Sequence, residues 1–404
     1  MIQDIAPEID SQNRGGRRVR IGFWLVAAVY ALVMLGGTLP IPLYAFWAPQ
    51  MGFGPFTTTL VFAVYALGTV LALMMFAPLS DRAGRRPLLA AGLLSAAAST
   101  ALFLVARDVG TLLAARFLCG LAAGVSNSTA TAALNELADG DVRRASIVST
   151  AANLGGLGLG AVVAGVFAQY GADPTHLVFW AYLATLAPAL LAVAITPETV
   201  VVRGRPALAV RRPTVPARDA GRPEFWRAAA AVLAAFAVGG LFSSLVPGFL
   251  HDRLHVHNIA AIGAQIGLLF LIALVSQVAA PARWLSSHRP APLLLIAGVA
   301  AVQTALWTRS LPLFVGGTIL AGAGIGLVFR SGIAVTQRLA DPQRRADLLS
   351  TYFLAAYTGS IVPTLALGLL DQALNENLAT LLLSAAVVAT TLASALKRPT
   401  PAAA

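Results

Sequence analysis

Charged side chains are scarce in this sequence. Asp, Glu, Lys and Arg make up 11% of the 404 residues, about half of their share in an average soluble protein. Apolar residues make up 58% of the chain, and the mean hydropathy is +0.78. This composition excludes an ordinary soluble globular protein and indicates a protein of the membrane.

Cysteine is nearly absent, because Cys119 is the single one in the chain. It lies inside an apolar run, so a disulfide framework and a cysteine-based metal site are both excluded. The apolar runs also lack a zinc-protease motif or a nucleophile motif, which argues against an intramembrane enzyme. A receptor would need an extramembrane domain, and no polar segment is long enough for one. We therefore expect no enzyme activity, no metal and no other cofactor.

Apolar runs of about 20 residues recur along the whole chain. As a helix, such a run crosses a hydrocarbon core of about 30 Å. The alternating pattern of a membrane barrel is missing, so helices are the remaining way to satisfy the backbone in lipid. We predict an all-α membrane protein with twelve transmembrane helices. The predicted spans are 22–46, 57–78, 88–106, 111–135, 145–169, 175–196, 227–250, 258–280, 290–308, 311–337, 347–370 and 375–396.

The net charge of +11 comes from basic residues that are unevenly placed. If the N-terminus is cytoplasmic, 23 of the 28 Lys and Arg residues fall on the cytoplasmic side of the predicted spans. This is the positive-inside rule, so the charge predicts orientation, with both termini cytoplasmic, rather than a nucleic-acid surface. The first 20 residues are polar and contain no apolar core of a cleavable signal peptide. Lys397 is the only lysine, which favours a GC-rich bacterial genome and a bacterial inner membrane.

The two halves of the chain resemble each other. Residues 143–150 (RRASIVST) and 344–351 (RRADLLST) are identical at five of eight positions. Such a duplication predicts two pseudo-symmetric halves of six helices, a plan that places a transporter's binding site between its repeats. The predicted parts are a cytoplasmic tail at 1–20, an N-terminal half at 21–196, a cytoplasmic linker at 197–226, a C-terminal half at 227–398 and a tail at 399–404.

The loop predicted at residues 79–87 carries a family motif. Residues 77–86 read APLSDRAGRR, and this stretch resembles the G-x-L-x-D-R-x-G-R-R/K loop of the major facilitator superfamily, with Ala77 replacing the first glycine. The resemblance covers nearly the whole chain and implies the major facilitator fold and alternating access. It also implies a gating lock in this loop. The residues of that lock would be Asp81, Arg82, Gly84 and Arg85.

Two further motifs are similar to family patterns in helices 4 and 5. Arg116 begins an R-x-x-x-G pattern, which implies proton coupling or gating, with snorkelling toward the surface as the alternative. Residues 156–165 partly match the antiporter signature G-x-x-x-G-P-x-x-G-G, with a glycine-rich packing helix as the alternative. The predicted spans contain no central Asp or Glu, so coupling falls to residues near helix ends. The further coupling candidates are Glu136, Asp139, Arg144 and Asp341.

Arg330 lies within a predicted span, eight residues before Arg338. A central arginine costs about 2.5–3.5 kcal/mol on the lenient insertion scale, so we predict that Arg330 lines a cavity; snorkelling is the alternative. The resemblance places helices 1, 4, 7 and 10 around that cavity. Its other candidate lining residues are Tyr30, Met34, Asn127 and Ser243, for each of which ordinary helix packing is the alternative.

A cavity that bears an arginine but no acid suits neutral, amphipathic or anionic compounds. We predict a secondary active transporter that exports a small amphipathic or drug-like organic compound by proton-coupled antiport. The alternative is a facilitator or symporter for an anionic or sugar-like metabolite. The expected partners are the small-molecule substrate, protons and the lipid bilayer, without nucleic acid, and a monomer is expected.

Overall fold

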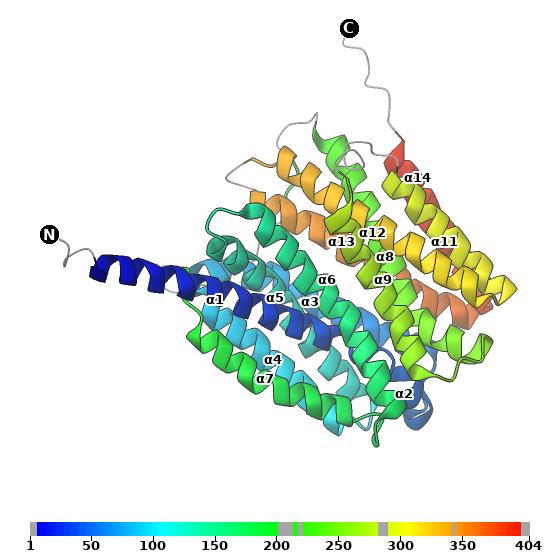
Figure 1. Ribbon diagram of the computed structural model, residues 1–404. Coiled ribbons are helices and arrows are strands. Elements are labelled where there is room, and N and C mark those ends of the chain that lie inside the picture. The colour runs from blue at the N-terminus through cyan, green and yellow to red at the C-terminus, as the bar shows by residue number, and fades with distance from the viewer. Residues whose placement is uncertain (1–5, 201–212, 217–220, 282–289, 342–344, 397–404) are drawn as a thin grey trace, which may run out of the picture. The chain divides into compact units, whose positions relative to one another are not determined.

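The computed structural model describes residues 6–200, 213–216, 221–281, 290–341 and 345–396. Side chains are described in these ranges except at 6–15, 77, 78, 81, 345 and 346. Every regular element in the described residues is a helix (Figure 1). The helices are α1 (Ala6–Thr38), α2 (Tyr44–Met51), α3 (Pro55–Ala83), α4 (Arg85–Val105), α5 (Val109–Leu137), α6 (Val142–Tyr170), α7 (Leu177–Ile195), α8 (Arg222–Gly248), the π-helical turn η2 (Phe249–Arg253), α9 (Ile259–Ala279), α11 (Pro290–Thr308), α12 (Leu311–Leu339), α13 (Arg345–Ala373) and α14 (Glu376–Ala395).

Twelve candidate membrane spans are found among the described residues, each long and apolar enough to cross a bilayer. The predicted all-α class with twelve spans is confirmed. Most helix ends lie within a few residues of their predicted positions, because hydropathy marks the apolar core of a span better than its last turn.

Two predicted boundaries are wrong. The first span was expected to reach residue 46, but α1 ends at Thr38. Pro40 and Pro42 follow, and proline both lacks an N–H donor and disfavours helix at the residue before it. A loop was also predicted at 79–87, but these residues are largely helical. Only Gly84 separates the end of α3 from the start of α4. Gly84 has a φ of 102°, a conformation open to glycine but strained for other residues.

The chain divides into two compact units. Unit 1 comprises the described residues of 1–52, 64–211 and 258–267, and unit 2 those of 53–63, 212–257 and 268–404. Helices α3 and α9 are each divided between the units. The other long helices belong to one unit each.

The same packing pattern occurs in both units. In unit 1, α1 packs against α5, α6 and α7, while α4 packs against α5 and α7. In unit 2, α8 packs against α12, α13 and α14, while α11 packs against α12 and α14. Each of these five helices of unit 2 therefore takes the role of the helix six spans earlier in the chain, as expected from the sequence repeat.

Glycines allow close helix contact in unit 1. A β-carbon at Gly156 would overlap the Ala31 carbonyl oxygen, and one at Gly160 would overlap that of Leu35. Both carbonyls belong to α1, so the smooth glycine face of α6 lets the two backbones approach. Gly156 and Gly160 of the glycine-rich run thus pack against α1 in the described structure, and the antiporter signature of this run stays a prediction.

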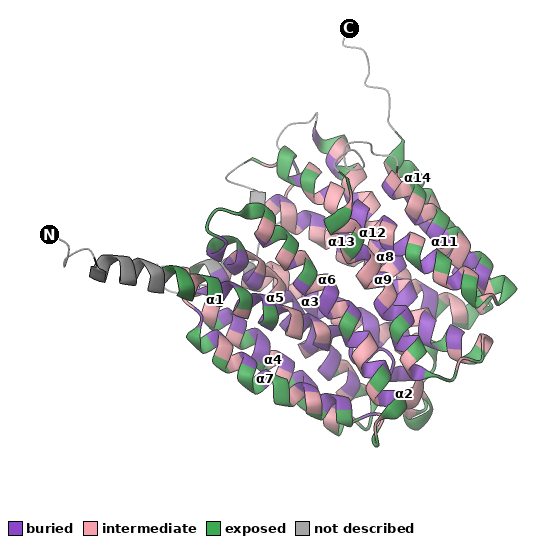
Figure 2. Ribbon diagram, viewed as in Figure 1, coloured by how far each residue is buried: buried purple, intermediate pink, exposed green. Residues whose placement is uncertain are grey.

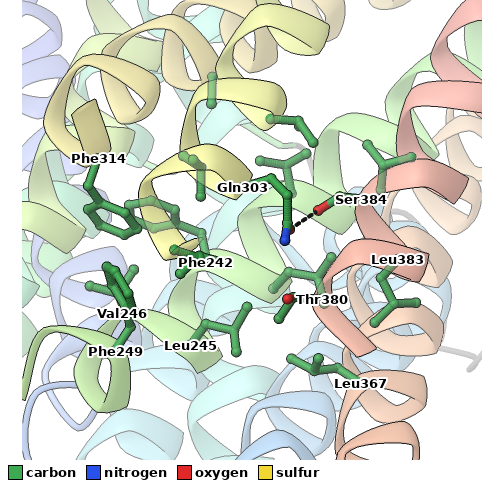
Figure 3. Close-up of a pocket in the computed structure, with 17 residues that line it drawn as sticks. Phe242, Leu245, Val246, Phe249, Gln303, Phe314, Leu367, Thr380, Leu383 and Ser384 are labelled. Atoms are coloured by element: carbon green, nitrogen blue, oxygen red, sulfur yellow. Dashed lines mark hydrogen bonds between the residues drawn. The ribbon is translucent and has the colours of Figure 1, made fainter. Parts of the chain in front are cut away.

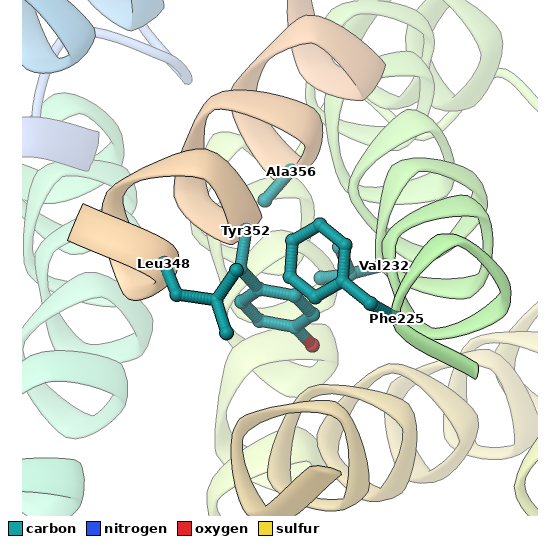
Figure 4. Packing of buried hydrophobic residues seen from close by; sticks show 5 residues of the cluster. All are labelled: Phe225, Val232, Leu348, Tyr352 and Ala356. Carbon is teal, nitrogen blue, oxygen red and sulfur yellow. The ribbon is translucent and has the colours of Figure 1, made fainter. Parts of the chain in front are cut away.

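Unit 2 has an apolar core between α8 and α13. Phe225 and Val232 of α8 pack with Leu348, Tyr352 and Ala356 of α13 (Figure 4). The Tyr352 hydroxyl reaches α12, where it donates to a backbone carbonyl at 3.3 Å. This hydrogen bond satisfies the polar end of an otherwise buried ring.

Exposed apolar side chains cover the outward faces of the helices. On α7, Val178, Phe179 and Tyr182 are buried, whereas Trp180 and Leu191 are 58% and 70% exposed. Figure 2 shows this division into buried and exposed sides along α4 and α7. Apolar surface of this extent on the outside of a helix bundle suits contact with lipid.

Candidate functional site

A cluster of ionic hydrogen bonds joins the start of α4 to the end of α5. Arg85 is 7% exposed, and its Nε and Nη2 atoms donate to the two carboxylate oxygens of Glu136 at 3.2 and 2.7 Å. Its Nη1 atom donates to the Ser80 hydroxyl on α3. A two-pronged arginine–carboxylate pair has strong geometric preferences, so this contact fixes the three helix ends against one another.

The segment that follows α7 completes the cluster. The Glu198 carboxylate accepts hydrogen bonds from the backbone N–H groups of Arg85 and Arg86, at 2.8 and 3.0 Å. These N–H groups belong to the first turn of α4 and therefore have no partner within the helix. A negative charge is also favourable at a helix N-terminus. The Thr199 hydroxyl donates to Glu136. We call Ser80, Arg85, Glu136, Glu198 and Thr199 the Arg85–Glu136 cluster.

Gly84 makes room for this arrangement. A β-carbon at that position would lie 2.7 Å from a carboxylate oxygen of Glu198. Glycine is therefore needed at the α3–α4 junction for two reasons, its backbone conformation and the close approach of Glu198.

The predicted gating residues are only partly brought together. Gly84, Arg85 and Glu136 meet in the cluster, whereas Arg82 is exposed. The side chain of Asp81 lies outside those that the structure describes. Asp139 is exposed with a φ of 53°, and no described residue forms an ion pair with it. Asp341 is exposed just beyond the end of α12.

Sequence reasoning missed Glu198 and Thr199. The available signal was a carboxylate two residues after the end of the predicted span 175–196. Its role depends on the chain returning from α7 to the start of α4, which no local pattern encodes.

Arg116 is enclosed within unit 1. Its side chain is fully buried, and its Nη1 atom donates to the Gly37 carbonyl oxygen of α1 at 2.9 Å. The guanidinium carbon lies 4.6 Å from the centre of the Tyr65 ring on α3, a cation–π distance. The charge is thus held by protein groups of α1 and α3, and a coupling role for Arg116 stays a prediction.

Arg144 ties the start of α6 to α1. Its guanidinium carbon lies 4.6 Å from the Phe23 ring centre and 5.6 Å from that of Trp24. Its backbone N–H donates to the capping carboxylate of Asp141 at 2.9 Å. Arg144 therefore acts in the described structure as a helix-to-helix contact, separate from the Arg85–Glu136 cluster.

An uncharged polar cluster lies between α1, α5 and α6. The Tyr30 hydroxyl donates to the Asn127 amide oxygen. The Asn153 amide nitrogen donates to the Tyr30 hydroxyl at 2.6 Å and to the Asn127 oxygen at 3.4 Å. Tyr30 is 1% exposed, whereas both amides are half-buried. Among the described residues, no hydrogen bond is found to the Asn127 amide nitrogen or the Asn153 amide oxygen, so one could donate to a ligand and the other could accept from it.

Tyr30 and Asn127 were predicted from the sequence, but Asn153 was missed. Asn127 was predicted because the family resemblance places helix 4 around the cavity, whereas Asn153 lies in helix 5. The signal available for Asn153 was an amide side chain in the middle of an apolar span. A polar side chain inside a span is costly unless it finds a partner. Asn153 therefore deserved the same interpretation as Asn127.

The other predicted binding residues are satisfied within their own units. Met34 is 3% exposed and packs where α1 meets α6 at Gly156. Ser243 donates to the Gly239 carbonyl oxygen at 2.9 Å. Arg330 donates to the carbonyl oxygen of Gln277, in the last turn of α9, where a helix presents its negative end. Substrate binding by these three residues stays a prediction.

Family membership follows from comparison with known proteins. The family model described as the Major Facilitator Superfamily matches residues 26–364. The chain belongs to this superfamily. The family predicted from residues 77–86 is confirmed, and the chain is a multi-pass membrane transporter rather than an enzyme.

Solved structures of major facilitator transporters share the fold. The human organic anion transporter TETRAN is 19% identical, with 93% of this chain and 99% of that chain covered and a TM-score of 0.64. A bacterial homologue of the human lysosomal transporter Spinster, inward-facing and unoccupied, gives 14% identity, coverage of 94% and 93%, and a TM-score of 0.69. The nucleoside transporter NupG is 13% identical, with 93% of this chain and 98% of that chain covered and a TM-score of 0.71. No curated protein matches the sequence.

Proposed function

We propose that this chain is a proton-coupled antiporter that exports a small, neutral, amphipathic organic compound by alternating access. The observation that carries the proposal is the uncharged cluster of Tyr30, Asn127 and Asn153, which lies between α1, α5 and α6 of unit 1. It offers one donor and one acceptor without a net charge. Such a pair suits a hydroxyl, carbonyl or amide group on an otherwise apolar molecule.

The distribution of acids supports a neutral rather than a cationic substrate. Every Asp and Glu in the described spans lies within two residues of a span end. A cation that entered the middle of these spans would meet no carboxylate there. Leaving a charge uncompensated in a low-dielectric site is costly, so a cationic substrate is disfavoured.

The Arg85–Glu136 cluster supports the gating part of the proposal. It connects α3, α4, α5 and the segment after α7, so a movement of any of these helix ends must break ionic hydrogen bonds. Glu136 is its titratable centre. Protonation of Glu136 would remove the charge that Arg85 faces and would weaken the lock. By the positive-inside rule this end is cytoplasmic, and both termini lie on the same side of a bacterial inner membrane.

A second candidate is a facilitator or symporter for an anionic or sugar-like metabolite. It is favoured by the absence of a carboxylate from the middle of the described spans, because many proton-coupled mechanisms use a buried acid. The donor and acceptor of the uncharged cluster also fit sugar hydroxyls. The structural relatives include an organic anion transporter and a nucleoside transporter. The test therefore includes anionic as well as neutral compounds.

The test is transport in proteoliposomes against matched neutral, anionic and cationic compounds. We expect neutral amphipathic compounds to be transported best, and Asn127→Leu to reduce their transport about tenfold at low concentration, because one or two hydrogen bonds are lost. Asn135 is an exposed amide on the same helix, so Asn135→Leu is the matched control and should transport normally. Transport confined to cations, or full activity of Asn127→Leu, contradicts the proposal.

A further inference from the structure

A cavity of about 50 Å³ lies inside unit 2. Residues of α8, η2, α11, α12, α13 and α14 line it, and it is partly open. It is separate from the two clusters of unit 1. Figure 3 shows apolar side chains on most sides, with Gln303, Thr380 and Ser384 as its polar groups. No charged side chain lines it among the described residues, so it is unsuited to an ion.

Gln303 presents an unused hydrogen-bond donor to this cavity. The side chain is 7% exposed, and its amide oxygen accepts from the Ser384 hydroxyl at 3.0 Å. Its amide nitrogen is buried and has no hydrogen-bond partner among the described residues. A buried donor without a partner is destabilising, and an acceptor placed in the cavity would relieve this cost.

The equivalent place in unit 1 is nearly filled. The cavity between α1, α4, α5 and α7 measures about 10 Å³. There Phe179 stacks on Trp47 and Phe103, with ring centres 5.9 and 5.0 Å apart. The Phe103 and Phe179 rings line this smaller cavity.

The difference is traceable to α7 and α14. Buried positions of α7 recur in α14 with a constant shift of 201 residues. The pairs are Val178 and Ala379, Phe179 and Thr380, Tyr182 and Leu383, and Leu186 and Val387. Thr380 therefore stands where unit 1 has Phe179, and loss of that ring leaves room beside Gln303.

We propose that this cavity binds the aliphatic end of a neutral molecule whose carbonyl or ether oxygen accepts a hydrogen bond from Gln303. The apolar lining favours an alkyl group, and the free amide N–H selects an acceptor without charge. A volume of this size holds on the order of four or five non-hydrogen atoms, and because the pocket is partly open, the rest of a larger molecule can extend out of it. The ligand is either a small solute or the ester-bearing part of a lipid chain, since both have this chemistry.

The test uses the purified full chain and 2-pentanone as the probe. A diazirine analogue of 2-pentanone is photolysed with the protein, and the labelled peptides are identified by mass spectrometry. We expect labelling of α11 and α14 that unlabelled 2-pentanone suppresses. Gln303→Leu should weaken that competition about five- to tenfold, the effect of one hydrogen bond. Thr380→Phe should abolish labelling by restoring the ring that unit 1 has.

Thr304 provides the matched control. It is an exposed neighbour of Gln303 on α11, so Thr304→Val should label as the unaltered chain does. Undiminished labelling in Thr380→Phe, equal competition in Gln303→Leu, or labelling spread evenly over exposed helix faces would overturn the proposal. If Thr380→Phe does not fold, Thr380→Leu and Gln303→Leu decide the question in the same way.

Native mass spectrometry distinguishes the two sources. A phospholipid that stays bound to the unaltered chain and is lost from Thr380→Phe identifies a lipid chain as the ligand. Competed labelling without retained lipid identifies a small solute. A cavity that excludes the probe in the unaltered chain after delipidation holds water alone, and the proposal then fails.

Discussion

Glu198 shows how one side chain can position a helix junction. Its carboxylate accepts hydrogen bonds from two backbone N–H groups in the first turn of α4, and Gly84 leaves the space that the carboxylate needs. The carboxylate is an exposed group, so its contribution rests on these two directed hydrogen bonds more than on long-range charge, which water screens.

Replacing this carboxylate should loosen the first turn of α4. We expect Glu198→Ala to lower the free energy of unfolding by about 1 kcal/mol, as for the loss of other N-terminal caps. Hydrogen exchange of the amides of Arg85 and Arg86 should rise about fivefold, which corresponds to that free energy. Glu198→Gln keeps an acceptor oxygen and should show a smaller rise. Unchanged exchange at α4 in Glu198→Ala would contradict this role.

Single residues could be predicted where burial in lipid makes them expensive. Tyr30 and Asn127 were identified as polar or aromatic side chains on helices that the family resemblance places around the cavity, and the structure pairs them. Glu198 could not be identified in this way, because it lies outside the spans and its partners are backbone groups far away in the sequence. A contact of that kind depends on the path of the chain rather than on the type of residue.

At the scale of helices, hydropathy predicts number and type but not the ends. All twelve spans follow from apolar runs of sufficient length. The ends depend on single residues that change the backbone, such as Pro40 after α1 and Gly84 between α3 and α4. The pattern of charges at 79–87 suggested a loop, although helical turns carry the same charges equally well at a membrane surface.

Close contact between α1 and α6 should depend on the absence of a side chain at Gly160. A β-carbon there would overlap the Leu35 carbonyl oxygen and the Thr38 hydroxyl. We expect Gly160→Ala to lower the free energy of unfolding by about 1–3 kcal/mol, the usual cost of overpacking. This can be measured by thermal or denaturant unfolding of the purified protein.

Gly239 of α8 is the control for this substitution. A β-carbon at Gly239 meets no atom within 4 Å, and alanine favours helix over glycine by up to about 1 kcal/mol. Gly239→Ala should therefore be neutral or stabilising. Equal destabilisation by both substitutions would show that chain flexibility, rather than contact between α1 and α6, explains these glycines.

At the scale of the whole molecule, the sequence repeat predicted two halves with the same helix packing, and both units have it. What the repeat did not predict is where the halves differ. The cavity beside Gln303 arises because Thr380 replaces a ring at one position of α14, and such a substitution leaves no motif. Differences of side-chain size at matching positions become informative only when the buried faces of both helices are known.

The proton coupling that we propose requires a group that binds and releases a proton. The carboxylates of the described spans lie at span ends, so an acid that binds the coupled proton would lie there, and a histidine is the alternative. Glu136 is the candidate, since it accepts from Arg85 and Thr199 at a junction of several helices. Glu136→Gln mimics the protonated form. It should therefore abolish uphill transport driven by a pH gradient in proteoliposomes while downhill exchange of the substrate continues.

Glu224 is the matched control, because it is also an acid near a span end and is paired with Arg338 in unit 2. Glu224→Gln removes a comparable charge without touching the Arg85–Glu136 cluster, so gradient-driven transport should persist. If a pH gradient drives no uphill transport in the unaltered chain, the facilitator is the correct alternative. If the gradient drives transport equally well in Glu136→Gln, the proton binds elsewhere. The lock at the α3–α4 junction would then respond to the substrate alone.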